Sequence, residues 1–135
     1  MGGFTLIEIM VVVVIIGLLV GIVAPNVMER LRRAEIGRAE ADIKSITTAL
    51  DFFRMDQYRY PTTDEGLDIL LGDAEIDGKP VAQHLKSAPV DPWGNPYLYV
   101  SPSTHGEDYD VYTLGADGKE GGEGVNADIG SWTLK

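Results

Sequence analysis

The sequence predicts an α+β protein in which one long N-terminal helix packs on a small antiparallel β-sheet. Three observations lead to this prediction. The chain opens with an apolar run, Ile9–Ala24, that contains no polar or charged side chain. Further on, apolar residues recur at alternating spacings of 3 and 4, the period of one helix face: Ile36, Ala39, Ile43, Ile46, Leu50 and Phe53. The last third of the chain contains short segments rich in aromatic and β-branched residues, which are typical of strands.

The apolar run is expected to enter a membrane and to stay on the mature protein. Its 16 residues fall short of the roughly 20 that cross a bilayer, but counting the apolar residues before Glu8 brings the segment to about that length. No small-x-small cleavage site follows it, whereas Gly2-Gly3-Phe4 lies before it, so cleavage there would leave the helix in place. Glu8 is the anomaly, because a carboxylate in a membrane segment is costly unless it is paired or lies at the interface. It either sits among lipid head groups or awaits a positive partner from another copy.

One helix is expected from Thr5 to about Tyr58, ending before Tyr60-Pro61. Pro25 lacks a backbone donor and is expected to kink or locally melt it. The remaining elements are expected in this order: a short helix after Thr62 or Thr63 carrying Leu67, Leu70 and Leu71, a connection over 72–89 with one helical turn near Val81–Leu85, a tight turn over 91–96, and strands over 97–100, 109–114 and 131–134.

Composition narrows the classes of function. The net charge of −10 and the pI of about 4.4 argue against a nucleic-acid partner. The chain has no cysteine, so no disulfide stabilises the soluble part and zinc is disfavoured. His84 and His105 are isolated in loops, and Asp64-Glu65 reads as the acidic first turn of a helix rather than a catalytic pair. We therefore expect no enzymatic site.

The segment Gly115–Gly130 is rich in both glycine and oxygen ligands. Ordering so many glycines is unfavourable and buries little apolar surface, so the segment alone should be flexible. Carboxylates, amides and backbone carbonyls are the ligands that Ca²⁺ prefers. The segment holds Asp117, Glu120, Glu123, Asn126 and Asp128, without the spacing of an EF-hand. A calcium loop and a plain flexible acidic loop both remain open.

The residues Gly3-Phe4-Thr5-Leu6-Ile7-Glu8-Ile9-Met10, followed by Val11–Ile16, resemble the leader junction of type IV pilins and type II secretion pseudopilins. Within that superfamily the chain is most similar to the major pseudopilins of type II secretion systems. This narrower resemblance lies in Arg59–Thr63 with Gly66-Leu67, Asp91–Gly94, Leu114–Gly118 and Asp128–Trp132. It extends over most of the chain outside residues 72–87. One departure is the leader, Met-Gly-Gly, which has no basic residue.

The resemblance implies specific roles at the N-terminus. A prepilin peptidase would cleave between Gly3 and Phe4 and methylate the new amine of Phe4. Glu8 would neutralise the Phe4 amine of a neighbouring subunit. We also expect Pro25 to take part in assembly. Among the exposed charges, Asp51 on the helix and Lys86 in the middle loop are our candidates for an ion pair between subunits. Residues 1–3 would be a leader remnant, 4–28 a transmembrane and assembly helix, and 29–135 a periplasmic head.

The resemblance also implies a pilin-like fold with a Ca²⁺-stabilised C-terminal loop. Its ligands would be the Leu114 carbonyl, Asp117 and Asp128, with the Val125 carbonyl and Asn126 as weaker candidates.

The implied function is that of the major structural subunit of a pseudopilus, a periplasmic fibre that drives export of folded proteins across the outer membrane. Its partners would be further copies of itself, minor pseudopilins, an inner-membrane assembly platform and, before assembly, the bacterial inner membrane in which it is single-pass. A type IV pilin, a minor pseudopilin and a membrane-anchored calcium-binding module remain as alternatives.

Overall fold

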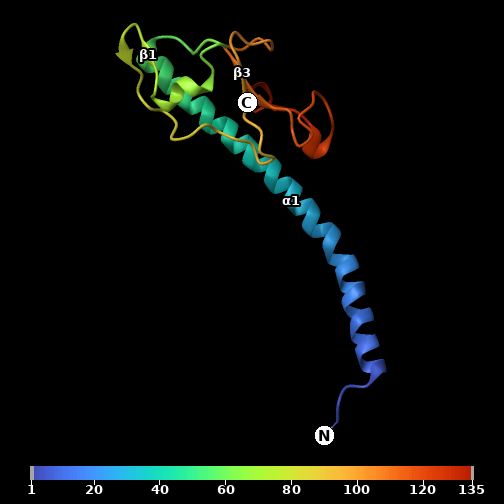
Figure 1. Ribbon diagram of the computed structural model, residues 1–135. Helices are drawn as coiled ribbons and strands as arrows, with labels where there is room; N and C mark the ends of the chain where they lie inside the picture. The colour runs from blue at the N-terminus through green and yellow to red at the C-terminus, as the bar shows by residue number, and fades with distance from the viewer. Residues whose placement is uncertain (1, 135) are drawn as a thin grey trace. The chain divides into compact units, whose positions relative to one another are not determined.

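The computed structural model describes residues 2–134, and Figure 1 shows its elements in chain order. A single helix, α1 (Leu6–Gln57), leads into a region of short elements. Contacts divide the chain into two compact units with a boundary between Ala34 and Glu35. We call residues 2–34 the N-terminal unit and residues 35–134 the head.

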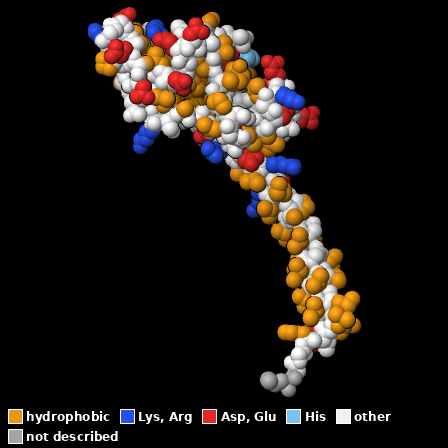
Figure 2. All heavy atoms as spheres, in the orientation of Figure 1, with side chains coloured by type: hydrophobic (Ala, Val, Ile, Leu, Met, Phe, Trp, Pro, Cys, Tyr) orange, Lys and Arg blue, Asp and Glu red, His pale blue; other side chains and the backbone are white. Residues whose placement is uncertain are grey.

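The N-terminal unit consists of a short lead-in and the first part of α1. Every described residue of this unit is exposed, including all the large apolar side chains from Phe4 to Leu31 (Figure 2). By length and composition alone, α1 contains a segment apolar enough to cross a membrane. The predicted melting at Pro25 is wrong, because α1 is helical on both sides of this residue and through it. Proline removes one hydrogen bond, and the neighbouring helical residues keep theirs.

The core of the head forms on one face of α1, as the apolar stripe predicts. Ile43, Leu50 and Phe53 are fully buried, and Ile36 packs at the edge of the core. The side chains of Tyr97, Tyr99, Val111 and Ile129 from the sheet and its approach pack against this face. The other buried apolar side chains among the described residues are Ala39, Ile46, Ala49, Pro61, Leu67, Ile69, Leu70 and Val81.

An antiparallel sheet of three strands faces the helix, in the order β3 (Leu98–Val100), β4 (Asp110–Thr113) and β5 (Ile129–Gly130). Tyr99 pairs with Val111, and Tyr112 pairs with Gly130. The first two strands are confirmed with slightly shorter bounds. The predicted strand over 131–134 is wrong, since Ser131–Thr133 is the 3-10 helix η3.

The side chains after β5 explain this difference. The Thr133 hydroxyl donates to the Gly130 carbonyl at 2.8 Å and turns the chain. The Trp132 ring folds back over Gly130, so a Cβ added at Gly130 would collide with the ring. Residues with high strand propensity therefore form a turn here, because their side chains bond and pack locally.

The connection between α1 and the sheet contains η1 (Leu67–Leu71) and a hairpin of β1 (Glu75–Ile76) and β2 (Lys79–Pro80). The short helix expected after Thr62 is therefore a 3-10 helix, and the hairpin was not predicted. The helical turn expected near Val81–Leu85 is wrong. Its backbone donors bond elsewhere: Val81 N–H to Ala74, and His84 and Leu85 N–H to Leu70.

Candidate functional site

The first turn of α1 positions Glu8. The Glu8 carboxylate accepts from the Thr5 backbone N–H at 3.2 Å, and the Thr5 hydroxyl accepts from the Glu8 N–H at 3.2 Å. This reciprocal pair is a capping box, which satisfies two N–H groups that the helix leaves free. The Thr5-x-x-Glu8 signal was readable in the sequence but was missed there. Gly3 and Phe4 lie just before the helix, and Phe4 is 85% exposed.

The C-terminal loop (residues 114–128) connects β4 to β5 and closes on itself. The Ala116 N–H donates to the Val125 carbonyl at 2.7 Å, and joins the two arms of the loop. Gly115 allows this approach, because it has a φ of +78° and an added Cβ would lie 2.7 Å from the Val125 oxygen. Val125 and Asn126 lie in a single 3-10 turn, η2 (Gly124–Asn126).

The carboxylate of Asp128 has one oxygen atom in this loop without a hydrogen-bond partner. Its Oδ2 accepts from the Gly121 N–H at 3.0 Å, whereas its Oδ1 is buried and has no hydrogen-bond partner. Leaving a buried carboxylate oxygen without a partner costs about 1–3 kcal/mol or more. Hard, unpartnered oxygen is the donor that Ca²⁺ prefers, so this part of the loop fits that ion in its chemistry.

The other predicted ligands are only partly brought together. Asp117 is exposed, and its Oδ1 accepts from the Lys119 N–H at 3.1 Å. Leu114 is half-buried at the end of β4. Among residues 2–134, no three His, Cys, Asp or Glu side chains gather into a metal-binding group. A cation in this loop would thus depend on backbone carbonyls as well as on carboxylates.

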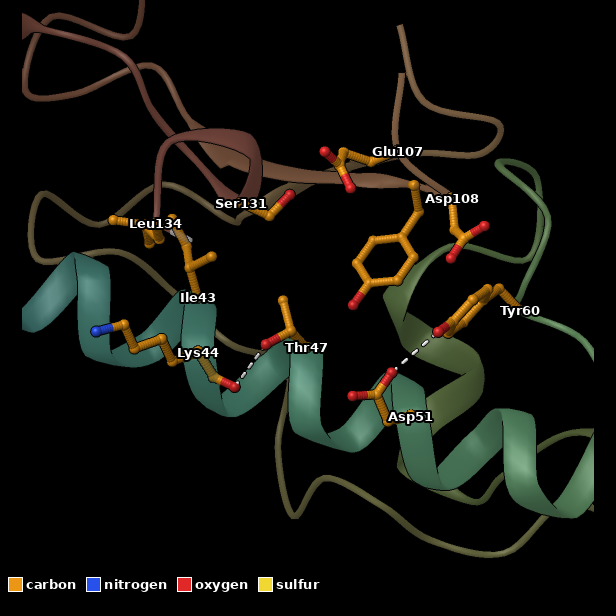
Figure 3. Close-up of a pocket in the computed structure, with 10 residues that line it drawn as sticks. Ile43, Lys44, Thr47, Asp51, Tyr60, Glu107, Asp108, Ser131 and Leu134 are labelled. Carbon is orange, nitrogen blue, oxygen red and sulfur yellow. Dashed lines mark hydrogen bonds between the residues drawn. The ribbon is translucent and has the colours of Figure 1, made fainter. Parts of the chain in front are cut away.

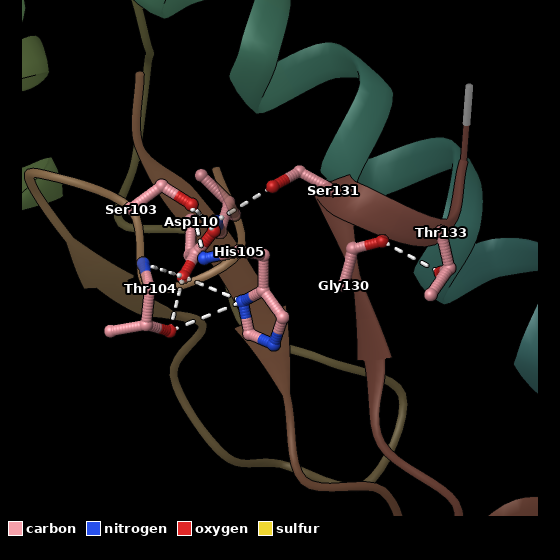
Figure 4. Close-up of polar contacts among 8 residues, drawn as sticks. Ser103, Thr104, His105, Asp110, Gly130, Ser131 and Thr133 are labelled. Carbon is pink, nitrogen blue, oxygen red and sulfur yellow. Dashed lines mark hydrogen bonds and ion pairs between the residues drawn. The ribbon is translucent and has the colours of Figure 1, made fainter. Parts of the chain in front are cut away.

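A second polar cluster surrounds Asp110 (Figure 4). This buried carboxylate accepts from the Ser103 hydroxyl, from the N–H and hydroxyl of Thr104, and contacts His105 Nδ1 at 2.9 Å. Burial opposes ionisation, but the hydrogen bonds from Ser103, His105 and Thr104 outweigh it and hold the pKa of Asp110 below its usual range. The His105 ring also stacks on Trp132, with ring centroids 3.8 Å apart.

Sequence reasoning missed this cluster, because Ser103, Thr104 and His105 reach Asp110 only when the loop after β3 closes. The Ser103 hydroxyl donates to the carboxylate of Asp110 and not to the imidazole of His105. A nucleophilic serine needs the opposite arrangement, with its proton passed to the ring. The cluster therefore holds the loop against β4 and η3.

Asp51 borders a polar hollow of about 280 Å³ between α1 and the segment after β3 (Figure 3). Its carboxylate accepts from the Tyr60 hydroxyl at 3.0 Å, and Arg54 donates to that same hydroxyl at 3.3 Å. Lys86 is exposed in the connection before β3. Within the described part of the head, no ion pair joins Asp51 to Lys86.

A helix that is apolar and exposed in its first half, and forms the core of a small α+β head in its second, defines a pilin-like subunit. Two family descriptions match the chain. "Prokaryotic N-terminal methylation motif" matches residues 1–24, and "Type II secretion system (T2SS), protein G" matches residues 26–132. The second match extends over most of the head and its helix.

Individual relatives agree with these families. The "Type II secretion system core protein G" of Pseudomonas aeruginosa is 51% identical over 134 residues, which cover 96% of this chain and 94% of the relative. The protein of the same name from Vibrio cholerae is 46% identical over 136 residues, covering 98% and 92%. The crystal structure of the major pseudopilin from the type 2 secretion system of enterohaemorrhagic Escherichia coli superimposes with a TM-score of 0.66 at 32% identity, covering 82% of this chain and 96% of that one. The chain belongs to the type II secretion system protein G family, the major pseudopilins.

Proposed function

We propose that this chain is the main building block of a type II secretion pseudopilus, a periplasmic fibre that moves folded proteins out through the outer membrane. In this role the chain is structural rather than catalytic. Before assembly it is a single-pass protein of the bacterial inner membrane, with its head in the periplasm. It then polymerises with copies of itself, in contact with minor pseudopilins and an inner-membrane assembly platform.

The exposed apolar surface of the N-terminal unit is the observation that carries this proposal. The side chains from Ile9 to Val23 are all about half exposed or more, except glycine, on every side of the helix. Exposing so much apolar surface to water is unfavourable, at roughly 25 cal/mol per Å². A bilayer can cover it before assembly, and the same segment of neighbouring copies can cover it in a fibre. Such contacts are heterologous, and where the rotation between neighbours does not close a ring they repeat as an open helical filament.

Processing would prepare the N-terminus for this assembly. Cleavage between Gly3 and Phe4 by a prepilin peptidase would free and then methylate the amine of Phe4, which lies in the exposed lead-in to α1. The Glu8 carboxylate lies in the first helical turn, where the capping box with Thr5 fixes its direction. A neighbour's Phe4 amine would neutralise Glu8 where water is excluded, and two opposite charges stabilise each other there only when they meet.

Calcium would complete the C-terminal loop. The ion would supply the positive partner that Asp128 Oδ1 lacks. Asp117, Asn126 and the carbonyls of Leu114 and Val125 would contribute the remaining oxygen donors. Since a cation that binds only the ordered loop stabilises it by mass action, calcium would replace the disulfide that this cysteine-free chain cannot form.

Asp51 and Lys86 would form an ion pair between neighbouring heads. Each lies on the surface of the head, and the Asp51 carboxylate accepts a hydrogen bond from Tyr60 of the same subunit. Exposed ion pairs contribute about 0–1 kcal/mol each, so the pair would set the register of subunits more than the strength of the fibre. Asp51→Lys and Lys86→Asp should each impair fibre formation and together restore it. If the double variant does not restore fibres, Asp51 and Lys86 do not form this ion pair.

Glu8→Ala tests the proposed function. The chain is produced in a bacterium that lacks its own copy, and sheared fibres are counted by electron microscopy while the membrane fraction is assayed for the precursor. Glu29→Ala serves as the matched control, because it removes one acid from the same helix, and only a surface pair with Arg33 at 3.1 Å. We expect no fibres from Glu8→Ala, with normal membrane insertion, and normal fibres from Glu29→Ala. Normal fibres from Glu8→Ala would overturn the role of Glu8 in assembly, whereas a wild type that forms no fibres would leave a membrane-anchored module.

A further inference from the structure

A chain of buried and part-buried polar contacts joins the C-terminal loop to α1. It begins at Gly115, whose N–H donates to the Thr113 hydroxyl at 3.3 Å. Thr113 in turn donates to Asp91 Oδ2 at 2.6 Å. Asp91 and Thr113 are 3% and 1% exposed, so their contacts form away from water, where hydrogen bonds are stronger.

The chain continues from Asp91 to the helix. The other carboxylate oxygen, Oδ1, accepts from the N–H groups of Trp93 and Asn95 at 3.0 and 2.8 Å. The Trp93 indole N–H then donates to the Glu35 carboxylate at 3.2 Å. Glu35 is the first residue of the head along α1, next to the boundary with the N-terminal unit. The buried carboxylate of Asp91 thus holds β4 on one oxygen and the turn that carries Trp93 on the other.

Asp91 also lies beside the start of the C-terminal loop. A cavity of about 200 Å³ is lined by Asp91, Asn95 and Thr113 together with Leu114, Gly115 and Gly118. Thr113 is the residue of β4 that pairs with Ile129, directly after Asp128. The Thr113 side chain therefore stands where both arms of the loop leave the sheet, on the side that faces Asp91.

We propose that Asp91 and Thr113 are the positioning residues of the C-terminal loop. They set the calcium affinity of the loop, and they pass the effect of calcium binding through Trp93 to Glu35. The proposal rests on the calcium loop of the proposed function. Fixing Gly115 fixes the arm that carries the Leu114 carbonyl and Asp117, so the ligand oxygens are held before the ion arrives. An ion bound to these oxygens restrains the arm further, and this restraint passes through Thr113 and the Asp91 carboxylate to the turn that carries Trp93.

The test uses the full chain in detergent micelles, labelled with ¹⁵N and titrated with Ca²⁺. The two tryptophans give two indole N–H signals, and Glu35→Ala identifies that of Trp93, because it removes the acceptor. We expect calcium to shift the Trp93 signal in the wild type. Thr113→Val should weaken calcium binding by about tenfold, as loss of a residue that orients metal ligands does, and should abolish the calcium-dependent shift.

Three further variants separate positioning from general destabilisation. Thr113→Ser keeps the hydroxyl and should restore both affinity and shift. Thr133→Val is the matched control, because it removes a threonine hydroxyl bonded to the Gly130 carbonyl at 2.8 Å, outside the chain of contacts, and should keep both. Asp91→Asn keeps the side-chain shape and can still accept hydrogen bonds from the N–H groups of Trp93 and Asn95. It therefore tests the positioning role if Thr113→Val does not fold. It should reproduce the loss of affinity.

Each contrary result has its own meaning. Wild-type calcium binding without a shift of Trp93 overturns the transmission to α1. Unchanged affinity in Asp91→Asn and Thr113→Val overturns the positioning role, with the calcium loop itself intact. A wild type that binds no calcium overturns the calcium loop of the proposed function, and this inference with it.

Discussion

Gly115→Ala should destabilise the head far more than the same change at another glycine of positive φ. Two contributions apply at Gly115. The φ of +78° places the new side chain in the left-handed region, which costs an L-residue about 1–2 kcal/mol. The added Cβ would also lie 2.7 Å from the Val125 oxygen and 2.8 Å from the Ala127 oxygen, so one arm of the loop must move.

Gly124→Ala is the matched control. Gly124 lies in the same loop with a φ of +60°, and nothing lies within 4 Å of its added Cβ. It therefore carries the conformational contribution without the collision. Forcing extra atoms into a packed site costs about 1–3 kcal/mol, so we expect Gly115→Ala to be less stable than Gly124→Ala by about 2 kcal/mol.

Thermal unfolding of the full chain in micelles, followed by circular dichroism in excess calcium, measures this difference. For a domain of this size, 1 kcal/mol lowers Tm by roughly 4–8 °C, so the two variants should differ by about 10 °C. Both should unfold in one transition, so that Tm values compare directly. Equal Tm values for the two variants would refute the close approach of Gly115 to residues 125–127.

Two further predictions concern the remainder of the head. Arg59 donates two hydrogen bonds to Glu65, of 2.6 and 3.0 Å, and they lower the pKa of Glu65 from 4.5 to about 2. The stability that this pair adds is therefore present above pH 4.5 and is lost as the pH falls toward about 2. In urea titrations Glu65→Gln should lower the free energy of unfolding by about 1 kcal/mol at pH 7, since Arg59 is partly solvated. The difference in stability from the wild type should vanish near pH 2, and a difference that does not depend on pH would contradict this assignment. Leu50→Ala should cost about 2–5 kcal/mol in the same assay, because Leu50 is fully buried on α1, whereas Met55→Ala, at a residue 71% exposed, should be nearly neutral. Similar losses of stability in the two variants would contradict the assignment of the buried face of α1 to the side that carries Leu50.

The main elements could be predicted because their signals are local and repeated. The stripe through Ile43 and Leu50 recurs over several helical turns, so it indicates both the helix and its buried face. The segments around Tyr99 and Val111 are rich in aromatic and β-branched residues, which is typical of strands. The junction at Gly3 and Glu8 points to the family through residue identity alone.

Features with weak or distant signals were missed. The Asp77-Gly78 turn is typical of a hairpin, but its strands have only two residues each, without apolar alternation. Trp132 and Thr133 have high strand propensity, yet their packing and bonding to Gly130 turn the chain.

Contacts between distant segments were beyond the reach of sequence patterns. The carboxylate of Asp91 meets Thr113 over 22 positions of the chain, and Trp93 meets Glu35 over 58. The two arms of the C-terminal loop approach each other only because Gly115 and Gly122 adopt positive φ. Composition could suggest calcium, whereas the unpartnered oxygen of Asp128 required coordinates.

The measurement that tests this account most directly is the Tm of the full chain in micelles, with excess calcium and with chelator, for the wild type and Asp128→Asn. Saturating an ordered site at about 100 times Kd adds about 2.7 kcal/mol, which corresponds to a Tm increase of roughly 10 °C or more. We expect this increase in the wild type, and little or none in Asp128→Asn, which loses the charge of the buried carboxylate. A wild-type Tm that is the same in calcium and in chelator would contradict the account, because the C-terminal loop would then hold its structure without an ion.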